Sequence, residues 1–325
     1  MRQLGRTGIE VSACCLGTMM FGKLGNPGQD DCARMVHRAL DSGINFVDTA
    51  DVYGYSETEE IVGKALKGRR DDVVLATKFN GPMGEGPNRR GSSRRWIVTA
   101  VEASLRRLRT DYIDLYQIHH PDPHTDIEET LSALTDLVRA GKVRAIGSSN
   151  LPASEIVEAQ WVSRQRALHR LRTEQPTYSL LNRAIEREVL PTCRRYGMGV
   201  LVWSPLSMGL LTGRYRKGAP RKDNARMHWV PQHLTDERKL DAVEQLLLVN
   251  RPECPSPTWP WPSPPPTRTS PPPSSARAPW TNWKISSRAP PSHSTTTFST
   301  GSTRSSRPAP TSAPWTSPTR PPPSP

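Results

Sequence analysis

The sequence contains two short apolar runs, Val73-Val-Leu-Ala-Thr-Lys78 and Ile113-Asp-Leu-Tyr-Gln-Ile-His119, separated by an amphipathic run at residues 94–108. Short runs rich in β-branched and aromatic residues predict buried strands. Apolar residues spaced three and four apart predict a helix between them. A strand, a crossover helix and a second strand form a unit in which the two strands are parallel.

The same alternation continues on both sides of this unit. Strands are predicted at residues 11–16, 44–48, 73–78, 113–119, 145–148, 173–175 and 199–203. Helices are predicted at residues 30–42, 57–67, 94–108, 127–140, 153–164, 186–196 and 235–249. Seven strand–helix repeats predict a parallel sheet with crossover helices. An opening hairpin of residues 2–4 with 11–12 is predicted around Gly5 and Gly8.

Two α/β architectures compete for this pattern. A doubly wound nucleotide-binding sheet requires G-x-G-x-x-G after its first strand, but the residues there are Leu16-Gly-Thr-Met-Met-Phe-Gly22. The glycine-rich run at residues 81–91 follows the third strand, and we interpret it as a surface loop. A (β/α)8 barrel fits better, because polar residues cluster at the carboxyl ends of several strands, where such barrels carry their active sites.

The composition changes abruptly between Val249 and Asn250. Residues 250–325 contain 22 of the 33 prolines and five of the nine tryptophans, but no Leu, Val, Met or Tyr. A segment so poor in apolar side chains cannot offset the entropy lost on ordering it. We therefore expect residues 1–249 to form the barrel and residues 250–325 to be a disordered Pro/Ser/Thr/Arg-rich tail.

The net charge of +13 is divided almost equally between these two parts. The tail has eight basic residues and one acidic residue, whereas residues 1–249 have 36 and 30. The tail arginines are scattered and no nucleic-acid-binding motif accompanies them, so a solvated basic coil is the simpler interpretation. The five cysteines lack a metal-binding spacing, and no apolar run predicts a signal peptide or a membrane span. These features favour a cytoplasmic protein.

Ionisable residues follow three consecutive predicted strands. Asp48 ends one strand with Tyr53 in the loop after it, Lys78 ends the next, and His119 ends the third. Each residue alone also has an ordinary structural interpretation. Asp48 could cap a helix, Tyr53 could be a packing residue, Lys78 a solvated charge and His119 a structural histidine. Together they predict proton donation to a carbonyl oxygen, because an ammonium lowers the pKa of a neighbouring phenol and a carboxylate holds the ammonium in place.

Longer motifs around these residues resemble the aldo-keto reductase family. The similar segments are Gly43-Ile-Asn-Phe-Val-Asp-Thr-Ala-Asp-Val-Tyr-Gly54, Ala76-Thr-Lys78, Asp111-Tyr-Ile-Asp-Leu-Tyr-Gln-Ile-His-His-Pro-Asp122, Gly141-Lys-Val-Arg-Ala-Ile-Gly-Ser-Ser-Asn150, Glu174-Gln-Pro-Thr-Tyr-Ser-Leu-Leu-Asn182 and Trp203-Ser-Pro-Leu-Ser-Met-Gly-Leu-Leu-Thr-Gly213. The resemblance covers residues 1–249 and stops there.

The resemblance implies a barrel enzyme that reduces an aldehyde or ketone with NADPH, or oxidises an alcohol with NADP+. It implies Tyr53 as the general acid, Asp48 and Lys78 as its tuning pair, and His119 as the residue that orients the substrate. It also implies that the nicotinamide carboxamide is bound by Ser149, Asn150 and Gln175, and that Trp203 stacks on the nicotinamide ring. The loop around the pyrophosphate would consist of Ser204, Pro205, Leu206, Gly209, Leu211 and Gly213. No metal is implied.

The resemblance ends before the eighth strand and helix of the family barrel and before its clamp for the adenosine 2′-phosphate. A shift of reading frame near codon 249 is our hypothesis for this. When the possible codons of Trp280-Thr-Asn-Trp283 are read in a frame moved back by one base, they encode four successive positions. These are an apolar residue, Asp, one of Gln, Glu, Lys or a stop, and Leu. In the same frame, codons 273–279 permit Ile-Ile-Gly-Pro-Arg-Thr, which resembles the missing block. We therefore expect an incomplete, poorly folded barrel with weakened cofactor affinity and weak or no activity.

Other functions stay open. Some members of the family are cofactor-binding regulatory subunits of membrane channels, and this chain could have the same role. A genuine Pro-rich tail could bind SH3-type domains, or its basic residues could bind nucleic acid. The identity of the carbonyl substrate and the oligomeric state are not predictable from the sequence.

Overall fold

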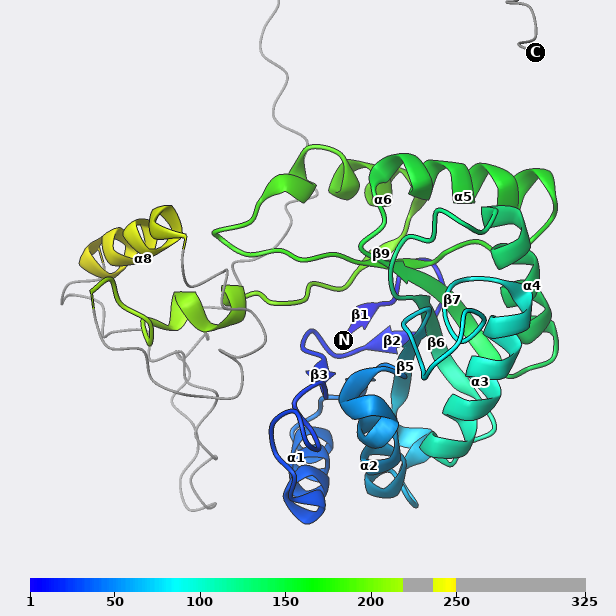
Figure 1. Ribbon diagram of the computed structural model, residues 1–325, viewed down its shortest axis with the longest axis horizontal. Coiled ribbons are helices and arrows are strands. Elements are labelled where there is room, and N and C mark those ends of the chain that lie inside the picture. Colours follow the sequence, from blue (N-terminus) through cyan, green and yellow to red (C-terminus); the bar gives the residue numbers. More distant parts are fainter. Residues whose placement is uncertain (219–235, 250–325) are drawn as a thin grey trace, which may run out of the picture. The chain divides into compact units, whose positions relative to one another are not determined.

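The computed structural model describes residues 1–218 and 236–249. Seven parallel strands form one curved sheet in which each strand pairs with the next along the chain (Figure 1). They are β3 (Leu16–Gly17), β4 (Phe46–Asp48), β5 (Val74–Phe79), β6 (Ile113–Ile118), β7 (Val143–Ser149), β8 (Thr173–Gln175) and β9 (Gly199–Val200). This order is that of a (β/α)8 barrel, of which the described residues supply seven strands.

Helices connect successive strands and cover the outer face of the sheet (Figure 1). They are α1 (Gln29–Asp41), α2 (Glu57–Ala65), α3 (Arg94–Leu108), α4 (Ile127–Arg139), α5 (Ala153–Gln165) and α6 (Val189–Tyr196), and α8 (Glu237–Val249) follows β9. Short 3-10 helices lie in the loops: η1 (Tyr53–Ser56), η2 (Arg70–Asp72), η3 (Ala184–Glu186) and η4 (Ser207–Thr212). The predicted fold, an incomplete (β/α)8 barrel, is confirmed.

The helix α3 illustrates why the sequence pattern predicted these elements. At its start the hydroxyl of Ser93 accepts a hydrogen bond from Trp96 N at 3.3 Å, which satisfies one of the free N–H groups of the first turn. The buried residues Ile97, Val101 and Leu105 then recur every four positions on one face. The helix ends where Arg109 adopts a left-handed conformation with φ 55°.

The predicted strand at residues 11–16 is wrong. Two separate strands are present instead, because β2 (Glu10–Val11) pairs antiparallel with β1 (Arg2–Gln3) and the chain bends before β3 begins. The side chain of Asn45, the residue before β4, holds this bend through two hydrogen bonds. Its Oδ1 accepts a hydrogen bond from Ser12 N at 2.7 Å, and its Nδ2 donates to Glu10 O at 3.1 Å. The predicted opening hairpin is confirmed.

The sheet separates two layers of core. The inner layer fills the concave side with Leu4, Val11, Phe46, Ala76, Leu115 and Ala145. The larger outer layer lies between the strands and the helices and contains residues such as Val47, Leu75 and Tyr116. Because alternate residues of a strand face the same side, inward-facing Ala76 and Leu115 are followed two residues later by Lys78 and Gln117. The apolar interior thus gives way to polar residues at the carboxyl ends of the strands.

The two edges of the sheet are β3 and β9. No strand joins these edges within residues 1–218 and 236–249, the part of the chain that the structure describes. The predicted disordered tail at residues 250–325 lies outside the described residues. Within the described ranges, none of the helices combines the length and the apolarity that crossing a bilayer requires.

Candidate active site

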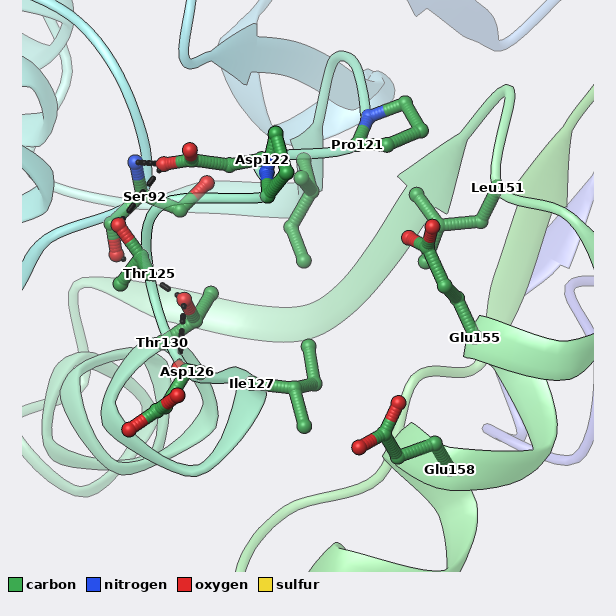
Figure 2. Close-up of a pocket in the computed structure, with 12 residues that line it drawn as sticks. Ser92, Pro121, Asp122, Thr125, Asp126, Ile127, Thr130, Leu151, Glu155 and Glu158 are labelled. Carbon is green, nitrogen blue, oxygen red and sulfur yellow. Dashed lines mark hydrogen bonds between the residues drawn. The ribbon is translucent and has the colours of Figure 1, made fainter. Parts of the chain in front are cut away.

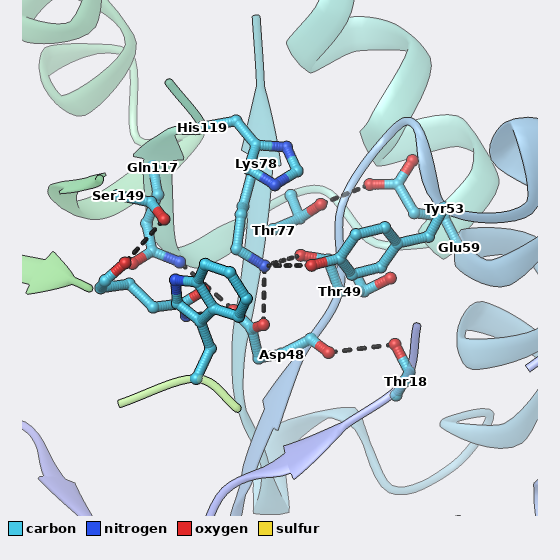
Figure 3. Close-up of polar contacts among 12 residues, drawn as sticks. Thr18, Asp48, Thr49, Tyr53, Glu59, Thr77, Lys78, Gln117, His119 and Ser149 are labelled. Carbon is cyan, nitrogen blue, oxygen red and sulfur yellow. Dashed lines mark hydrogen bonds and ion pairs between the residues drawn. The ribbon is translucent and has the colours of Figure 1, made fainter. Parts of the chain in front are cut away.

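The side chain of Lys78 lies at the centre of a polar cluster at the carboxyl ends of β4, β5 and β6 (Figure 3). It is fully buried. Its Nζ donates to Asp48 Oδ2 at 2.6 Å, to the carbonyl oxygen of Thr49 at 2.9 Å and to the hydroxyl of Tyr53 at 3.2 Å. An ammonium has three N–H groups, so each of them has one partner here.

Asp48 has a second set of donors on its other oxygen. Oδ1 accepts hydrogen bonds from Gln117 Nε2 at 3.2 Å and from Gln175 Nε2 at 3.0 Å. The sequence prediction missed Gln117. Its position two residues before His119 on the same strand was the available signal, since residues two apart face the same side. The carboxylate is therefore fixed by donors from three different strands.

Tyr53 reaches this cluster from the loop that follows β4. Burial raises the pKa of the phenol, and the opposing effect of Lys78 is smaller. Lys78 lowers the pKa of the phenol, as expected, but burial raises it by more, so the pKa of Tyr53 lies above its ordinary value. For Lys78, burial alone would lower the pKa, but Asp48 and Tyr53 together hold it above its ordinary value. Tyr53 is therefore a neutral hydroxyl and Lys78 a cation near neutral pH.

The rings of His119 and Tyr53 form an edge-to-face pair, with 5.9 Å between their centroids and an interplanar angle of 78°. The ring of His119 also stacks on that of His120, with 4.5 Å between the centroids. Burial, Lys78 and His120 lower the pKa of His119 to about 2, so the ring is neutral. Among the described residues its Nδ1 has no hydrogen-bond partner. A neutral imidazole with a free nitrogen can donate to or accept from a small oxygen-bearing ligand.

The predicted carboxamide-binding residues lie next to this cluster. Asn150 Nδ2 donates to the carbonyl oxygen of His119 at 3.2 Å and to Ser149 Oγ at 3.0 Å. The indole N–H of Trp203 donates to Asn150 Oδ1 at 3.1 Å, and Ser149 Oγ donates to the carbonyl oxygen of Gln175 at 2.8 Å. The structure therefore brings together all four residues and joins them to His119.

The predicted pyrophosphate loop forms a compact turn around η4. Ser204 Oγ accepts from Met208 N at 2.9 Å, and Ser204, Ser207 and Met208 all have positive φ. The N–H groups of Ser207, Gly209, Leu211 and Gly213 donate to carbonyl groups of the same loop. The loop also contains Pro205 and Leu206, and Leu210 packs against Val243 of α8. The role of this loop in binding the cofactor pyrophosphate remains a prediction.

The carboxyl ends of β6, β7 and β8 keep polar groups that could bind a ligand. The buried atoms His119 Nδ1 and Gln117 Oε1 have no hydrogen-bond partner among the described residues, so polar capacity remains for a ligand. The amide of Asn150 and the indole of Trp203, which is only partly buried, lie beside them. The predicted loss of the family's 2′-phosphate clamp concerns sequence beyond residue 249, outside the described residues.

A separate hollow of about 240 Å³ is lined in part by the loop after β6 (Figure 2). Its walls come from that loop and from the first turns of α4 and α5. Ile118, Ile127 and Leu151 form an apolar part, and Asp126, Glu155 and Glu158 lie around it. Asp122, predicted as a loop residue, accepts hydrogen bonds from Ser92 N and from the hydroxyl of Thr125. The sequence prediction did not include this hollow.

Residues 13–250 match the model of the Aldo/keto reductase family. The chain belongs to this family. Similar members include the uncharacterized oxidoreductase YrpG of Bacillus subtilis (strain 168), which is 48% identical over 225 residues, or 66% of this chain and 68% of that protein. The aldo-keto reductase YhdN of the same organism is 44% identical over 212 residues, or 64% of this chain and 62% of that protein.

A third relative has a different kind of name. A probable voltage-gated potassium channel subunit beta of Oryza sativa subsp. japonica is 40% identical over 223 residues, which is 67% of each chain. The chain thus spans about two thirds of the length of the relatives that it matches. The family and the names of the two bacterial relatives identify an oxidoreductase lineage.

Proposed function

We propose that this member of the aldo/keto reductase family reduces an aldehyde or a ketone with NADPH, or catalyses the reverse oxidation, with Tyr53 as the general acid. One observation carries the proposal: the ammonium of Lys78 lies within hydrogen-bond distance of both Asp48 and Tyr53. A phenol, an ammonium and a carboxylate in this order can release a proton to a bound carbonyl oxygen and stabilise the phenolate that remains.

The burial of the site supports this role for Tyr53. Because burial raises the pKa of the phenol, the hydroxyl keeps its proton until a substrate oxygen accepts it. After the transfer, the phenolate lies beside the buried charge of Lys78, whose attraction is little screened by water. His119, which is neutral, would orient the substrate oxygen toward Tyr53. When bound, the nicotinamide supplies the hydride for the carbonyl carbon.

We infer the cofactor site from the neighbouring residues. Ser149, Asn150 and Gln175 would bind the nicotinamide carboxamide, and Trp203 would stack on the ring. The loop from Ser204 to Gly213, with Pro205, Leu206, Gly209 and Leu211, would surround the pyrophosphate. The hydrogen bond between Trp203 Nε1 and Asn150 Oδ1 supports this arrangement, because it joins the stacking residue to the carboxamide group.

We further propose that residues 1–249 are the catalytic part and that residues 250–325 result from a shifted reading frame. The supporting observation is that the family match ends at residue 250. Without the clamp for the 2′-phosphate, affinity for NADPH should be weak and turnover slow. A cytoplasmic location follows from the proposed use of NADPH and stays a proposal.

A titration of the purified chain with NADPH and NADP+, followed by tryptophan fluorescence, tests the cofactor site. We expect saturable quenching, most of which disappears in Trp203→Phe because that indole would contact the nicotinamide ring. Trp161→Phe on α5 is the control, since Trp161 is exposed and is not one of the residues of the proposed site. Absence of any saturable change up to about 1 mM cofactor, equivalent to a binding free energy of about −4 kcal/mol, would contradict the proposal.

A second candidate is a cofactor-binding regulatory subunit of a membrane channel. The observation that favours it is the 40% identity to a protein named as a probable potassium channel subunit beta. In this case NADPH would bind with negligible turnover of any carbonyl compound, and a channel subunit would copurify with the chain. Rapid turnover without such a partner would exclude this role as the main one.

A further inference from the structure

Glu174 is a buried carboxyl group that the proposed chemistry does not use. It lies on β8 between Thr173 and Gln175, so its side chain faces the opposite side of the sheet from Gln175. It is fully buried. Ser148 Oγ donates to Glu174 Oε2 at 2.5 Å, and Leu151 N donates to Glu174 Oε1 at 3.1 Å. Both partners belong to the segment where β7 ends and turns toward α5.

This segment carries the residues that we assign to the nicotinamide carboxamide. Asn150 occupies its sharpest point, with a positive φ of 61°, a conformation that costs free energy for a residue other than glycine. On the active-site side, Asn150 contacts the carbonyl oxygen of His119 and the indole N–H of Trp203. On the other side, Glu174 holds the residues immediately before and after Ser149 and Asn150.

We propose that Glu174 is a positioning residue: from behind the sheet it holds the turn at residues 148–151 in the strained conformation that presents Ser149 and Asn150 to the cofactor. This inference rests on the proposed cofactor site. A strained turn persists only where the surrounding contacts over-determine it, and the two hydrogen bonds of Glu174 are such contacts.

The charge state of Glu174 controls how firmly it holds the turn. Burial raises the pKa of Glu174 to about 7, although hydrogen bonds from Ser148, Leu151 and Asn150 act in the opposite direction. Glu155, on α5, also raises the pKa of Glu174. On α6, burial and the neighbouring Glu174 raise the pKa of Cys193 to about 12, so the thiol stays neutral. Among the described residues that act on this carboxyl group, Glu155 adds negative charge near neutral pH, whereas the Cys193 thiol adds none.

Both forms of Glu174 can keep the geometry, but with different strength. The carboxylate accepts from Ser148 Oγ and from Leu151 N, but these hydrogen bonds offset only part of the cost of burying its charge, since the pKa of Glu174 is raised. The protonated group donates to Ser148 Oγ, whose own hydrogen can turn to the carbonyl oxygen of Thr173 at 3.4 Å. Opening of the turn would expose Glu174 to water and return its pKa toward the ordinary value of 4.5, so the closed turn loses stability as the pH rises toward 7.

Amide hydrogen exchange of Leu151 in the full chain tests this directly. In the unsubstituted chain we expect its protection factor, corrected for the intrinsic rate, to fall about tenfold between pH 6 and 8, because the closed turn loses about 1.4 kcal/mol as Glu174 ionises. Glu174→Gln keeps the shape, the acceptor for Leu151 and a donor for Ser148, but cannot ionise. Its protection factor should be the same at both pH values.

Glu155→Gln is the matched control, because Glu155 lies beside Leu151 on the wall of the hollow in Figure 2 and contributes only charge to Glu174. It should keep the tenfold fall but move its midpoint to lower pH. Identical pH profiles in the unsubstituted chain and in Glu174→Gln would overturn the proposal, whatever happens to cofactor binding.

A second measurement connects the turn to the cofactor. The dissociation constant for NADPH should be smaller in Glu174→Gln than in the unsubstituted chain at pH 8, by up to about tenfold, and equal in both at pH 6. Titration of the NADPH phosphate cancels, because the two chains are compared at the same pH. If neither chain binds NADPH, the proposed function fails, whereas the exchange result still decides whether Glu174 holds the turn.

Discussion

At the scale of single residues, Lys78 determines the electrostatics of the site. Its charge is fully buried, which is costly unless partners compensate it. Asp48 supplies the compensating charge, and two amides, Gln117 and Gln175, hold the second oxygen of that carboxylate. The pair is therefore oriented from several strands, and the remaining N–H of Lys78 is free to point at Tyr53.

The catalytic candidates were predictable because each follows a recognisable strand. Asp48, Lys78 and His119 end apolar runs, and the carboxyl ends of parallel strands meet at one face of the sheet. The direction of the pKa shift of Tyr53 was not predictable, because it depends on burial depth, which no local pattern encodes. Glu174 was quoted only as part of a motif, since no pattern distinguishes a polar residue facing the helices from one facing the site.

Asp51 supports a prediction about pH and stability. It is fully buried, its two oxygens have no partner among the described residues, and burial together with Glu59 raises the pKa of its carboxyl group to about 8. The folded chain keeps a proton that the unfolded chain releases above its ordinary pKa of 3.8. Folding stability is therefore fully present at low pH and falls as the pH rises toward 8, by about 1.4 kcal/mol per pH unit within that window.

The measurement is the thermal midpoint at pH 5 and pH 8. Asp51→Asn cannot ionise, so its midpoint should fall less between these pH values than that of the unsubstituted chain. Asp30→Asn, a change at an exposed carboxylate in the first turn of α1, serves as the control and should behave like the unsubstituted chain. An equal fall in all three chains would show that Asp51 is already ionised in the folded state at pH 5.

At the scale of elements, the N-terminal hairpin shows the limit of apolar patterns. A run of apolar residues at 11–16 predicted one strand, but the chain changes partner from β1 to β4 within it. The change depends on Asn45, a polar residue 33 positions after Ser12 in the sequence. The helices were predicted more closely, because their periods and caps are local, as in α3 with Ser93 and Trp96.

We expect Asn45→Ala to destabilise the chain by about 1–3 kcal/mol, because it leaves the part-buried N–H of Ser12 without the partner it now has. The measurement is the free energy of unfolding in urea. Gln3→Ala is the matched control, since its hydrogen bond to Glu10 is exposed, and should change stability by less than about 0.5 kcal/mol. Equal effects of the two substitutions would mean that the bend does not depend on Asn45.

At the scale of the whole molecule, the sheet has edges where a closed barrel has none. The described residues provide no strand beside the outer edges of β3 and β9. Unpaired strand edges offer hydrogen-bonding groups to other chains and favour aggregation. The fold class was predictable because seven strand–helix repeats precede residue 249, and the incomplete closure was predictable because the family motifs stop there.

The reading-frame hypothesis predicts a gain when the frame is restored. A chain carrying residues 1–249 followed by the alternative frame should bind NADPH at least about tenfold more tightly, equivalent to about 1.4 kcal/mol, and should unfold in one cooperative transition. Cofactor titration and calorimetry measure the two effects. Sequencing of the source DNA from codon 240 onward should reveal an added or missing base near codon 249. An unaltered frame, or no gain in affinity, would contradict the hypothesis.

The most direct test of the account is a single-turnover measurement of NADPH oxidation by the purified chain with an aromatic aldehyde, compared with Tyr53→Phe at saturating cofactor. The account predicts slow but measurable oxidation in the unsubstituted chain and a rate about 10²–10⁴ times lower in Tyr53→Phe, with unchanged affinity for NADPH. Equal rates in the two chains would show that Tyr53 is not the proton donor.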